Sequence, residues 1–136
     1  RPFHMETAKL KIMIIEDEAC IRESLTWFLE DLGHEVVAGV APFNCDVYKG
    51  HSCTRNTSCT NALLIDQHLP GMKGLDFIAA LRERGCKGIT SNVLLMSEDS
   101  TSIDHEKARG LGATVVQKPM DFEYLEEWLS RVKTPG

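Results

Sequence analysis

Short apolar runs alternate along this chain with segments in which apolar residues recur every three or four positions. An apolar run of about four to eight residues is typical of a strand covered on both faces, and the helical spacing is typical of an amphipathic helix. Strands are therefore predicted at 10–16, 36–40, 62–66, 92–97 and 113–117, and helices at 20–32, 75–81, 103–111 and 122–132. This order predicts an α/β fold, a doubly wound five-stranded parallel sheet with helices on both faces.

One crossover departs from the alternation. Residues 41–61, between the second and third predicted strands, are rich in Asn, Thr, Ser, Gly and Cys and have no apolar stripe at helical spacing. Such residues favour turns, because their side chains compete for the backbone hydrogen bonds of a helix. We therefore predict an irregular crossover, with Val47 and Tyr48 as its apolar anchors.

Composition limits the classes of protein that this chain can belong to. Its 136 residues, 43% hydrophobic and 26% charged, predict one globular domain, which we expect at 9–132. Residues 1–4 are interpreted as a cloning remnant before Met5, and 133–136 as a tail. Because no apolar run is long enough to span a membrane, a cytoplasmic protein without membrane contact is expected. A net charge of -5 without a run of Lys or Arg argues against direct nucleic-acid binding.

Acidic residues follow two of the predicted strands. Glu16 and Asp17 end the first strand, and Asp66 ends the third. The carboxyl ends of neighbouring parallel strands meet at one edge of a sheet, so these three carboxylates are expected to face one pocket. Like charges raise one another's pKa, and Mg²⁺ with its preference for oxygen ligands can neutralise them. The sequence predicts a Mg²⁺ site here, whereas Glu18 is interpreted as a surface charge.

Two further strands end on polar residues that suit a phosphoryl group. Ser97 supplies a hydroxyl, and Lys118, followed by Pro119, supplies an ammonium. Either residue alone is more often a cap or a solvated charge. Together with the three acids they predict a site in which a carboxylate accepts a phosphoryl group, while the metal, hydroxyl and ammonium balance its charge.

These motifs resemble the receiver domain of two-component response regulators, which has a flavodoxin-like fold. The resemblance covers nearly all of residues 9–132 and rests on Glu16-Asp17, on Asp66 followed by LPGMKG at 69–74, on Ser97, and on Lys118-Pro119. It implies a sheet in the order 2-1-3-4-5 with five helices. It also implies a phosphoprotein of signal transduction that receives its phosphoryl group from a sensor histidine kinase and is not a turnover enzyme on an external substrate.

The resemblance further implies a role for each site residue. Asp66 is the phosphoacceptor that becomes an aspartyl phosphate, Asp17 is a direct Mg²⁺ ligand, and Glu16 is a ligand through water. The backbone carbonyl of His68 is a further Mg²⁺ ligand. Ser97 and Lys118 bind phosphoryl oxygens, and the peptide bond between Lys118 and Pro119 is cis.

Two residues depart from the family pattern. Glu98 follows the hydroxyl residue at a position where the family has a small residue, and its bulk and charge are expected to slow phosphorylation. Val115 occupies a position where the family usually has an aromatic ring that swings inward on activation. The coupling between the phosphorylation site and the face around the last strand is therefore expected to differ in this chain.

Five cysteines leave a second hypothesis open. Cys45, Cys53 and Cys59 lie in the irregular crossover with His51, and such ligands suit Zn²⁺ or iron or a redox pair. Their spacing matches no familiar zinc pattern, so incidental thiols are the competing interpretation. The alternative function is a pseudo-receiver, an interaction module with weak or no phosphorylation that responds to redox state or metal through these three cysteines.

The remaining cysteines and some other α/β functions can be assigned more simply. Cys20 is expected to be a small buried residue of the first helix, and Cys86 to be exposed in a turn. An aspartyl-nucleophile phosphatase needs a second Asp two positions after Asp66, where His68 stands. A dinucleotide site or a P-loop needs glycines after the first strand, where this chain has Glu-Asp-Glu.

Overall fold

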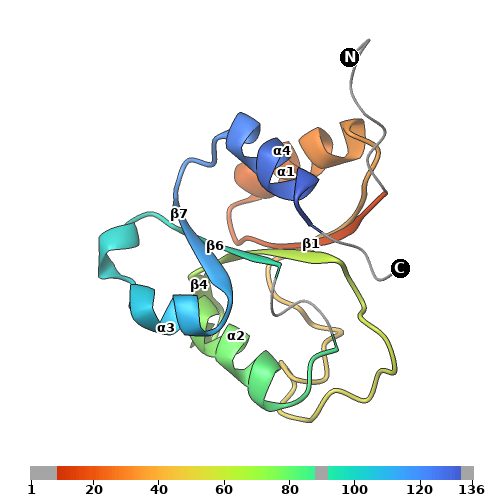
Figure 1. Cartoon of the computed structure of the whole chain (residues 1–136), viewed down its shortest axis with the longest axis vertical. Coiled ribbons are helices and arrows are strands. Elements are labelled where there is room, and N and C mark those ends of the chain that lie inside the picture. Colours follow the sequence, from red (N-terminus) through yellow and green to blue (C-terminus); the bar gives the residue numbers. More distant parts are fainter. Residues whose placement is uncertain (1–8, 88–91, 133–136) are drawn as a thin grey trace.

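Five parallel strands form the central sheet of the computed structural model, which describes residues 9–87 and 92–132 (Figure 1). They are β1 (Lys11–Ile15), β2 (Glu35–Gly39), β3 (Ala62–Asp66), β6 (Val93–Ser97) and β7 (Ala113–Gln117). Their order in space, β2-β1-β3-β6-β7, confirms the predicted order 2-1-3-4-5. The apolar runs located each strand to within one residue because the strands are covered on both faces and read as nearly continuous hydrophobic segments.

Each face of the sheet has its own hydrophobic core. Successive strand residues point to opposite faces, so the even-numbered residues of β1, β3 and β6 form one cluster and the odd-numbered residues form the other. The even cluster packs on α1 (Ala19–Asp31) and α4 (Phe122–Ser130), and the odd cluster packs on α2 (Gly74–Glu83) and α3 (His105–Gly110). Figure 1 shows these two pairs of helices on opposite sides of the sheet.

The helix predicted through Ile103 begins later than expected. A short 3-10 helix, η1 (Ser100–Ser102), precedes it, and Ile103 is buried in the connection between the two. The carboxylate of Asp104 accepts a hydrogen bond from the amide of Lys107 at 3.0 Å and caps α3, which therefore starts at His105. The spacing misled the prediction because Ile103 is a core residue supplied by a loop.

The second crossover is irregular, as predicted. Residues 40–61 contain neither helix nor strand, so the part of the chain that the structure describes has four α-helices, not the five that the resemblance implies. Val47 is buried, and the ring of Tyr48 packs edge-on against Phe77 with ring centroids 5.8 Å apart. The Tyr48 hydroxyl also donates to the carbonyl oxygen of Pro70 at 2.9 Å. These two anchors hold the crossover against the α2 side of the sheet.

A small hairpin that the apolar pattern did not predict connects β3 to α2. Its strands are β4 (His68–Leu69) and β5 (Met72–Lys73), and Gly71 turns the chain between them with a φ of 81°. The hairpin brings Gly74 against the end of β3, where an added Cβ would overlap the carbonyl oxygen of Asp66. A side chain at position 74 is therefore excluded by the backbone of the residue that ends β3.

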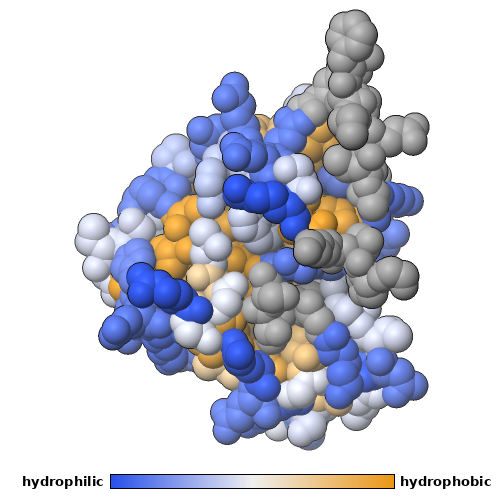
Figure 2. Space-filling view, viewed as in Figure 1, coloured by the Kyte–Doolittle hydropathy of each residue, from blue (hydrophilic) through white to orange (hydrophobic). Residues whose placement is uncertain are grey.

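The surface in Figure 2 is mostly hydrophilic over the outer sides of the helices, and apolar residues appear mainly between the two helical layers. Three large apolar side chains are nevertheless well exposed among the described residues: Trp27, Val37 and Phe43. In residues 9–87 and 92–132, no helix combines the length and the apolar character that a membrane crossing requires.

Candidate functional site at the carboxyl edge of the sheet

Polar residues from four strands meet at one edge of the sheet. Asp66 is the last residue of β3 and Ser97 the last residue of β6, while Glu16 and Lys118 directly follow β1 and β7. Since all the strands are parallel, these ends share the same edge. The structure thus brings the predicted residues together, and Glu16, Asp66 and Ser97 are each buried there.

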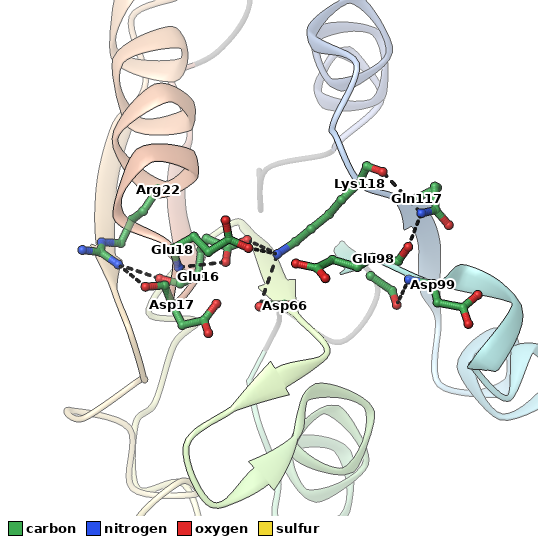
Figure 3. A network of polar contacts seen from close by, with 10 residues as sticks. Glu16, Asp17, Glu18, Arg22, Asp66, Glu98, Asp99, Gln117 and Lys118 are labelled. Carbon is green, nitrogen blue, oxygen red and sulfur yellow. Dashed lines mark hydrogen bonds and ion pairs between the residues drawn. The ribbon is translucent and has the colours of Figure 1, made fainter.

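Lys118 is the positive centre of this edge. Its Nζ lies 2.7 Å from Glu16 Oε1 and 3.3 Å from Asp66 Oδ2, and its side chain is only 7% exposed (Figure 3). Burial by itself lowers the pKa of Lys118, but the contacts with Glu16 and Asp66 outweigh burial, and the pKa is raised. The lysine is therefore a stable ammonium among carboxylates.

The carboxylates differ in how their surroundings change their pKa. Burial raises the pKa of Glu16 to about 7 against the opposing effect of Lys118. Burial also raises the pKa of Asp66, opposed by the backbone amide of His68 and by Lys118. Asp17 is exposed, and its pKa is lowered chiefly by its contact with Glu16. Two buried carboxylates and an exposed one thus share a single ammonium, which leaves the site short of positive charge.

The donor set fits a hard divalent cation such as Mg²⁺. Carboxylate oxygens of Glu16, Asp17 and Glu18 lie within 4.8 Å of one another. Asp66 Oδ1 is buried and has no hydrogen-bond partner among the described residues. Oxygen ligands with excess negative charge are what Mg²⁺ binds in proteins. Glu18 is exposed at the surface, and its carboxylate also lies within this acid group.

Ser97 and Glu98 stand at the end of β6. The amide of Asp99 donates to Ser97 Oγ at 3.1 Å, so the hydroxyl proton of Ser97 is left to donate elsewhere. Figure 3 shows the Glu98 side chain pointing toward the Lys118 ammonium. The pKa of Glu18 is raised chiefly by Glu98, which means that these two carboxylates face each other beside the ammonium.

Two residues that the strand-end pattern does not include hold the site in shape. Arg22 Nη1 donates to the carbonyl oxygen of Glu16 at 2.7 Å and reaches that of Asp17 at 3.5 Å, so it fixes the acidic turn. The Gln117 side chain donates to the carbonyl of Glu98 and accepts from the amide of Ser100, which joins the ends of β6 and β7. Arg22 could have been found from the sequence, because it is a cation in the first turn of a helix that directly follows three acids. No comparable sequence feature points to Gln117.

The structure also describes three other positions that the sequence singled out, namely His68, the Lys118–Pro119 peptide bond and Val115. His68 begins β4 with an exposed side chain, and the role of its carbonyl stays a prediction. The Lys118–Pro119 peptide bond is cis. Val115 is half-buried and packs with the core on the α2 and α3 face.

Both simple assignments of cysteines were wrong. Cys20 is exposed, because it lies in the first turn of α1, beyond the part of the helix that packs on the sheet. Cys86 is half-buried against the core on the α2 face, because the chain folds back after α2 and the amide of Cys86 donates to the carbonyl of Leu81 at 2.8 Å.

Comparison with protein families and curated sequences gives one consistent result. The family model for the response regulator receiver domain matches residues 12–130. The two-component response regulator PhoP of Pseudomonas aeruginosa is 32% identical over 122 residues, which cover 89% of this chain and 50% of PhoP. The chain spans about half the length of the curated relatives it matches.

Solved structures give the same fold. A CheY-like response regulator receiver domain from Methylobacillus flagellatus superposes with a TM-score of 0.72 at 24% identity, over 93% of this chain and 100% of that one. The receiver domain of the sensor histidine kinase PA1611 from Pseudomonas aeruginosa, solved with a magnesium ion coordinated in its active site cleft, gives a TM-score of 0.70 at 20% identity. That match covers 92% of this chain and 98% of the PA1611 domain. At these identities the likeness establishes the fold.

Proposed function

Since this chain belongs to the response regulator receiver domain family, we propose that Asp66 accepts a phosphoryl group from a sensor histidine kinase and that the modification changes which partners the domain binds. Receiver domains are signalling units of two-component systems rather than turnover enzymes on external substrates. A kinase donor of this kind implies that the domain works in the cytoplasm. The net charge of -5 supports a switch that acts on proteins and does not itself touch nucleic acid.

One observation carries the proposal. Asp66 is buried with Lys118 Nζ at 3.3 Å from its Oδ2, while its Oδ1 has no hydrogen-bond partner in the described part of the chain. A carboxylate that is oriented by a cation and keeps a free oxygen is prepared to form a new bond. The same cation stands where the transferred phosphoryl group brings additional negative charge.

The reaction that we propose is a transfer between two side chains. An oxygen of the Asp66 carboxylate attacks the phosphorus of a phosphohistidine, an O–P bond forms, and the P–N bond breaks. The imidazole nitrogen leaves with the electron pair of that bond and takes up a proton from solvent. Lys118 and the Ser97 hydroxyl donate to the phosphoryl oxygens during the transfer.

Four groups of this chain would hold Mg²⁺: the carboxylates of Glu16, Asp17 and Asp66, and the backbone carbonyl of His68. When bound, the ion supplies positive charge to the oxygens of the phosphoryl group in transit. Arg22 supports this set from behind, because it fixes the two carbonyls of the acidic turn that carries Glu16 and Asp17. The PA1611 receiver domain, solved with magnesium in its active site cleft, is consistent with this assignment.

Incubation with acetyl phosphate and Mg²⁺, followed by intact mass spectrometry, tests the proposal. We expect the protein to gain the mass of one phosphoryl group, and we expect EDTA to prevent the gain. Asp66→Asn keeps the shape of the side chain but removes the nucleophile, so it should not be labelled. Asp99→Asn is the matched control, because Asp99 is an exposed acid of the same edge, and it should be labelled like the wild type. A labelled Asp66→Asn variant would place the acceptor elsewhere, and an unlabelled wild type would favour the pseudo-receiver.

A further inference from the structure

A cavity lined by sulfur atoms occupies the place where a helix is missing. Its volume is about 540 Å³, and it lies between the irregular crossover, the sheet and α2. Four of the five cysteines line it, namely Cys45, Cys53, Cys59 and Cys86, together with the thioether of Met13. None of the residues proposed above for phosphorylation lines this cavity. It is a separate feature of the molecule.

The thiols come from segments that are distant in the sequence. Cys45 and Cys59 lie near opposite ends of the crossover, and Cys86 follows α2. They are nevertheless close enough in space for Cys59 and Cys86 to act electrostatically on Cys45. All of these cysteines are free thiols. Thiols gathered from three segments around one cavity differ from single cysteines that fill gaps in a packed core.

The part of the crossover that carries Cys59 can adjust its position. The amide of Cys53 is tied to the carbonyl oxygen of Arg84 at 3.0 Å, and Thr54 Oγ1 donates to Asp46 at 2.9 Å. Residues 55–59 belong to no helix or strand, and they rejoin the sheet at β3. A segment without a hydrogen-bonded ladder can move toward a ligand at little cost in backbone hydrogen bonds.

We propose that this cavity binds one thiophilic d¹⁰ metal ion, Zn²⁺ or Cu⁺, through Cys45, Cys59 and Cys86, with Cys53 as an available fourth ligand. Thiolates and thioethers are the ligands that select such ions over the hard cations suited to the carboxylate site. In the residues that the structure describes, no three thiols already lie within 4.8 Å of one another. Metal binding therefore draws the crossover inward and orders it.

The cysteines that line the cavity are available as metal ligands. All five cysteines are free thiols, and no disulfide joins the four that line the cavity. A bound metal ion deprotonates its cysteine ligands as it binds, so thiols that are protonated beforehand can still become ligands.

The two ions make different demands on the four cysteines. Zn²⁺ in a structural site takes four ligands in a tetrahedron, so it needs Cys53 as well as the other three. Cu⁺ is satisfied by two or three thiolates. The variant Cys53→Ser should therefore weaken Zn²⁺ binding. Loss of a residue that only hydrogen-bonds to a metal ligand weakens binding by roughly 10-fold to 100-fold, so loss of a ligand should weaken it at least as much. Cu⁺ binding should be unchanged.

Competition with a chromophoric chelator tests the proposal on the fully reduced protein under anaerobic conditions, with Zn²⁺ and Cu⁺ in separate titrations. We expect one equivalent of at least one ion to be taken from the chelator. The triple variant Cys45→Ser/Cys59→Ser/Cys86→Ser should lose this binding, and Cys20→Ser should retain it, since Cys20 lies outside the cavity. Co²⁺ should give thiolate charge-transfer absorption with the wild type and not with the triple variant.

The controls separate this proposal from the proposed function. A cooperative urea-unfolding transition reports whether the triple variant is folded. If it is not, the single variant Cys59→Ser replaces it, and its metal binding should be weakened. Acetyl phosphate labelling of Asp66 is measured separately and tests only the proposed function. Metal binding of undiminished affinity in the folded variants overturns the proposal, and so does a wild type that takes neither ion.

Discussion

Lys118 Nζ lies 2.7 Å from Glu16 Oε1, although the strands that these residues follow, β7 and β1, are not neighbours in the sheet. β3 and β6 lie between them, so the lysine side chain reaches across the ends of both strands. The same Nζ lies 3.3 Å from Oδ2 of Asp66, the last residue of β3. This buried ion pair closes the carboxyl edge of the sheet and holds the ammonium over the proposed phosphoacceptor.

Replacing Lys118 should therefore cost stability. Lys118→Met keeps the length of the side chain but leaves Glu16 and Asp66 buried without their cation, and we expect the free energy of unfolding to fall by about 3–5 kcal/mol. Lys107→Met is the matched control. Lys107 pairs with Asp76 at 3.2 Å, but both side chains are about half exposed, so the expected loss is below about 0.5 kcal/mol. Urea unfolding in Mg²⁺-free buffer measures both losses, and equal losses would contradict the role of the buried pair.

Glu98→Ala should speed labelling by acetyl phosphate. The Glu98 carboxylate points toward the Lys118 ammonium and opposes the charge of an anionic donor. One unit charge at roughly 6 Å in water contributes about 0.7 kcal/mol, which corresponds to about a threefold change in rate. Glu106→Ala, an exposed acid of α3, should leave the rate unchanged. The acceleration should shrink at high salt, and an unchanged or slower rate for Glu98→Ala at low salt would show that this carboxylate does not obstruct the donor.

Gly74→Ala should destabilise the fold at the proposed phosphoacceptor itself. The new Cβ would overlap the carbonyl oxygen of Asp66 and would lie 3.0 Å from Leu95 Cδ1, and the backbone of a central strand cannot move aside freely. We expect a loss of about 1–3 kcal/mol in the free energy of unfolding. Gly110→Ala should be neutral or slightly stabilising, because no heavy atom lies within 4 Å of the added Cβ. Urea unfolding of the two variants checks the contrast, which fails if both behave alike.

His34 should make stability depend on pH. It is buried, the amide of Leu10 donates to its Nδ1 at 3.1 Å, and burial lowers its pKa below the ordinary value of 6.5. The unfolded chain therefore binds a proton at a higher pH than the folded chain, so the contribution of His34 is complete above pH 6.5 and is lost as the pH falls below it. The slope can reach about 1.4 kcal/mol per pH unit for this one group.

Urea unfolding of the wild type and of His34→Gln between about pH 5 and pH 8 measures this linkage. The difference in free energy of unfolding between the two proteins should narrow as the pH falls. If the His34→Gln curve is instead parallel to that of the wild type, the proposed linkage is wrong.

The sequence alone determined the fold class, the five strands and the residues that end them. It could do so because a strand covered on both faces needs a continuous apolar run, and because a buried run must stop where polar groups reach solvent or a ligand. The irregular crossover was predictable for the complementary reason, since a segment without an apolar stripe has no face to pack as a helix. The places of Glu16, Asp66, Ser97 and Lys118 followed from these strand ends.

Which side chains meet across elements that are distant in the sequence depends on the packing of the folded chain. The reach of Lys118 to Glu16 over two strands, the support that Arg22 and Gln117 give to loop carbonyls, and the entry of Glu18 into the acid group depend on how the ends of the strands are packed. The gathering of cysteines around the cavity depends in the same way on a helix that is absent. Sequence patterns report the period and burial of one segment at a time, whereas these contacts follow from the distances between segments, which the packing of the whole core sets.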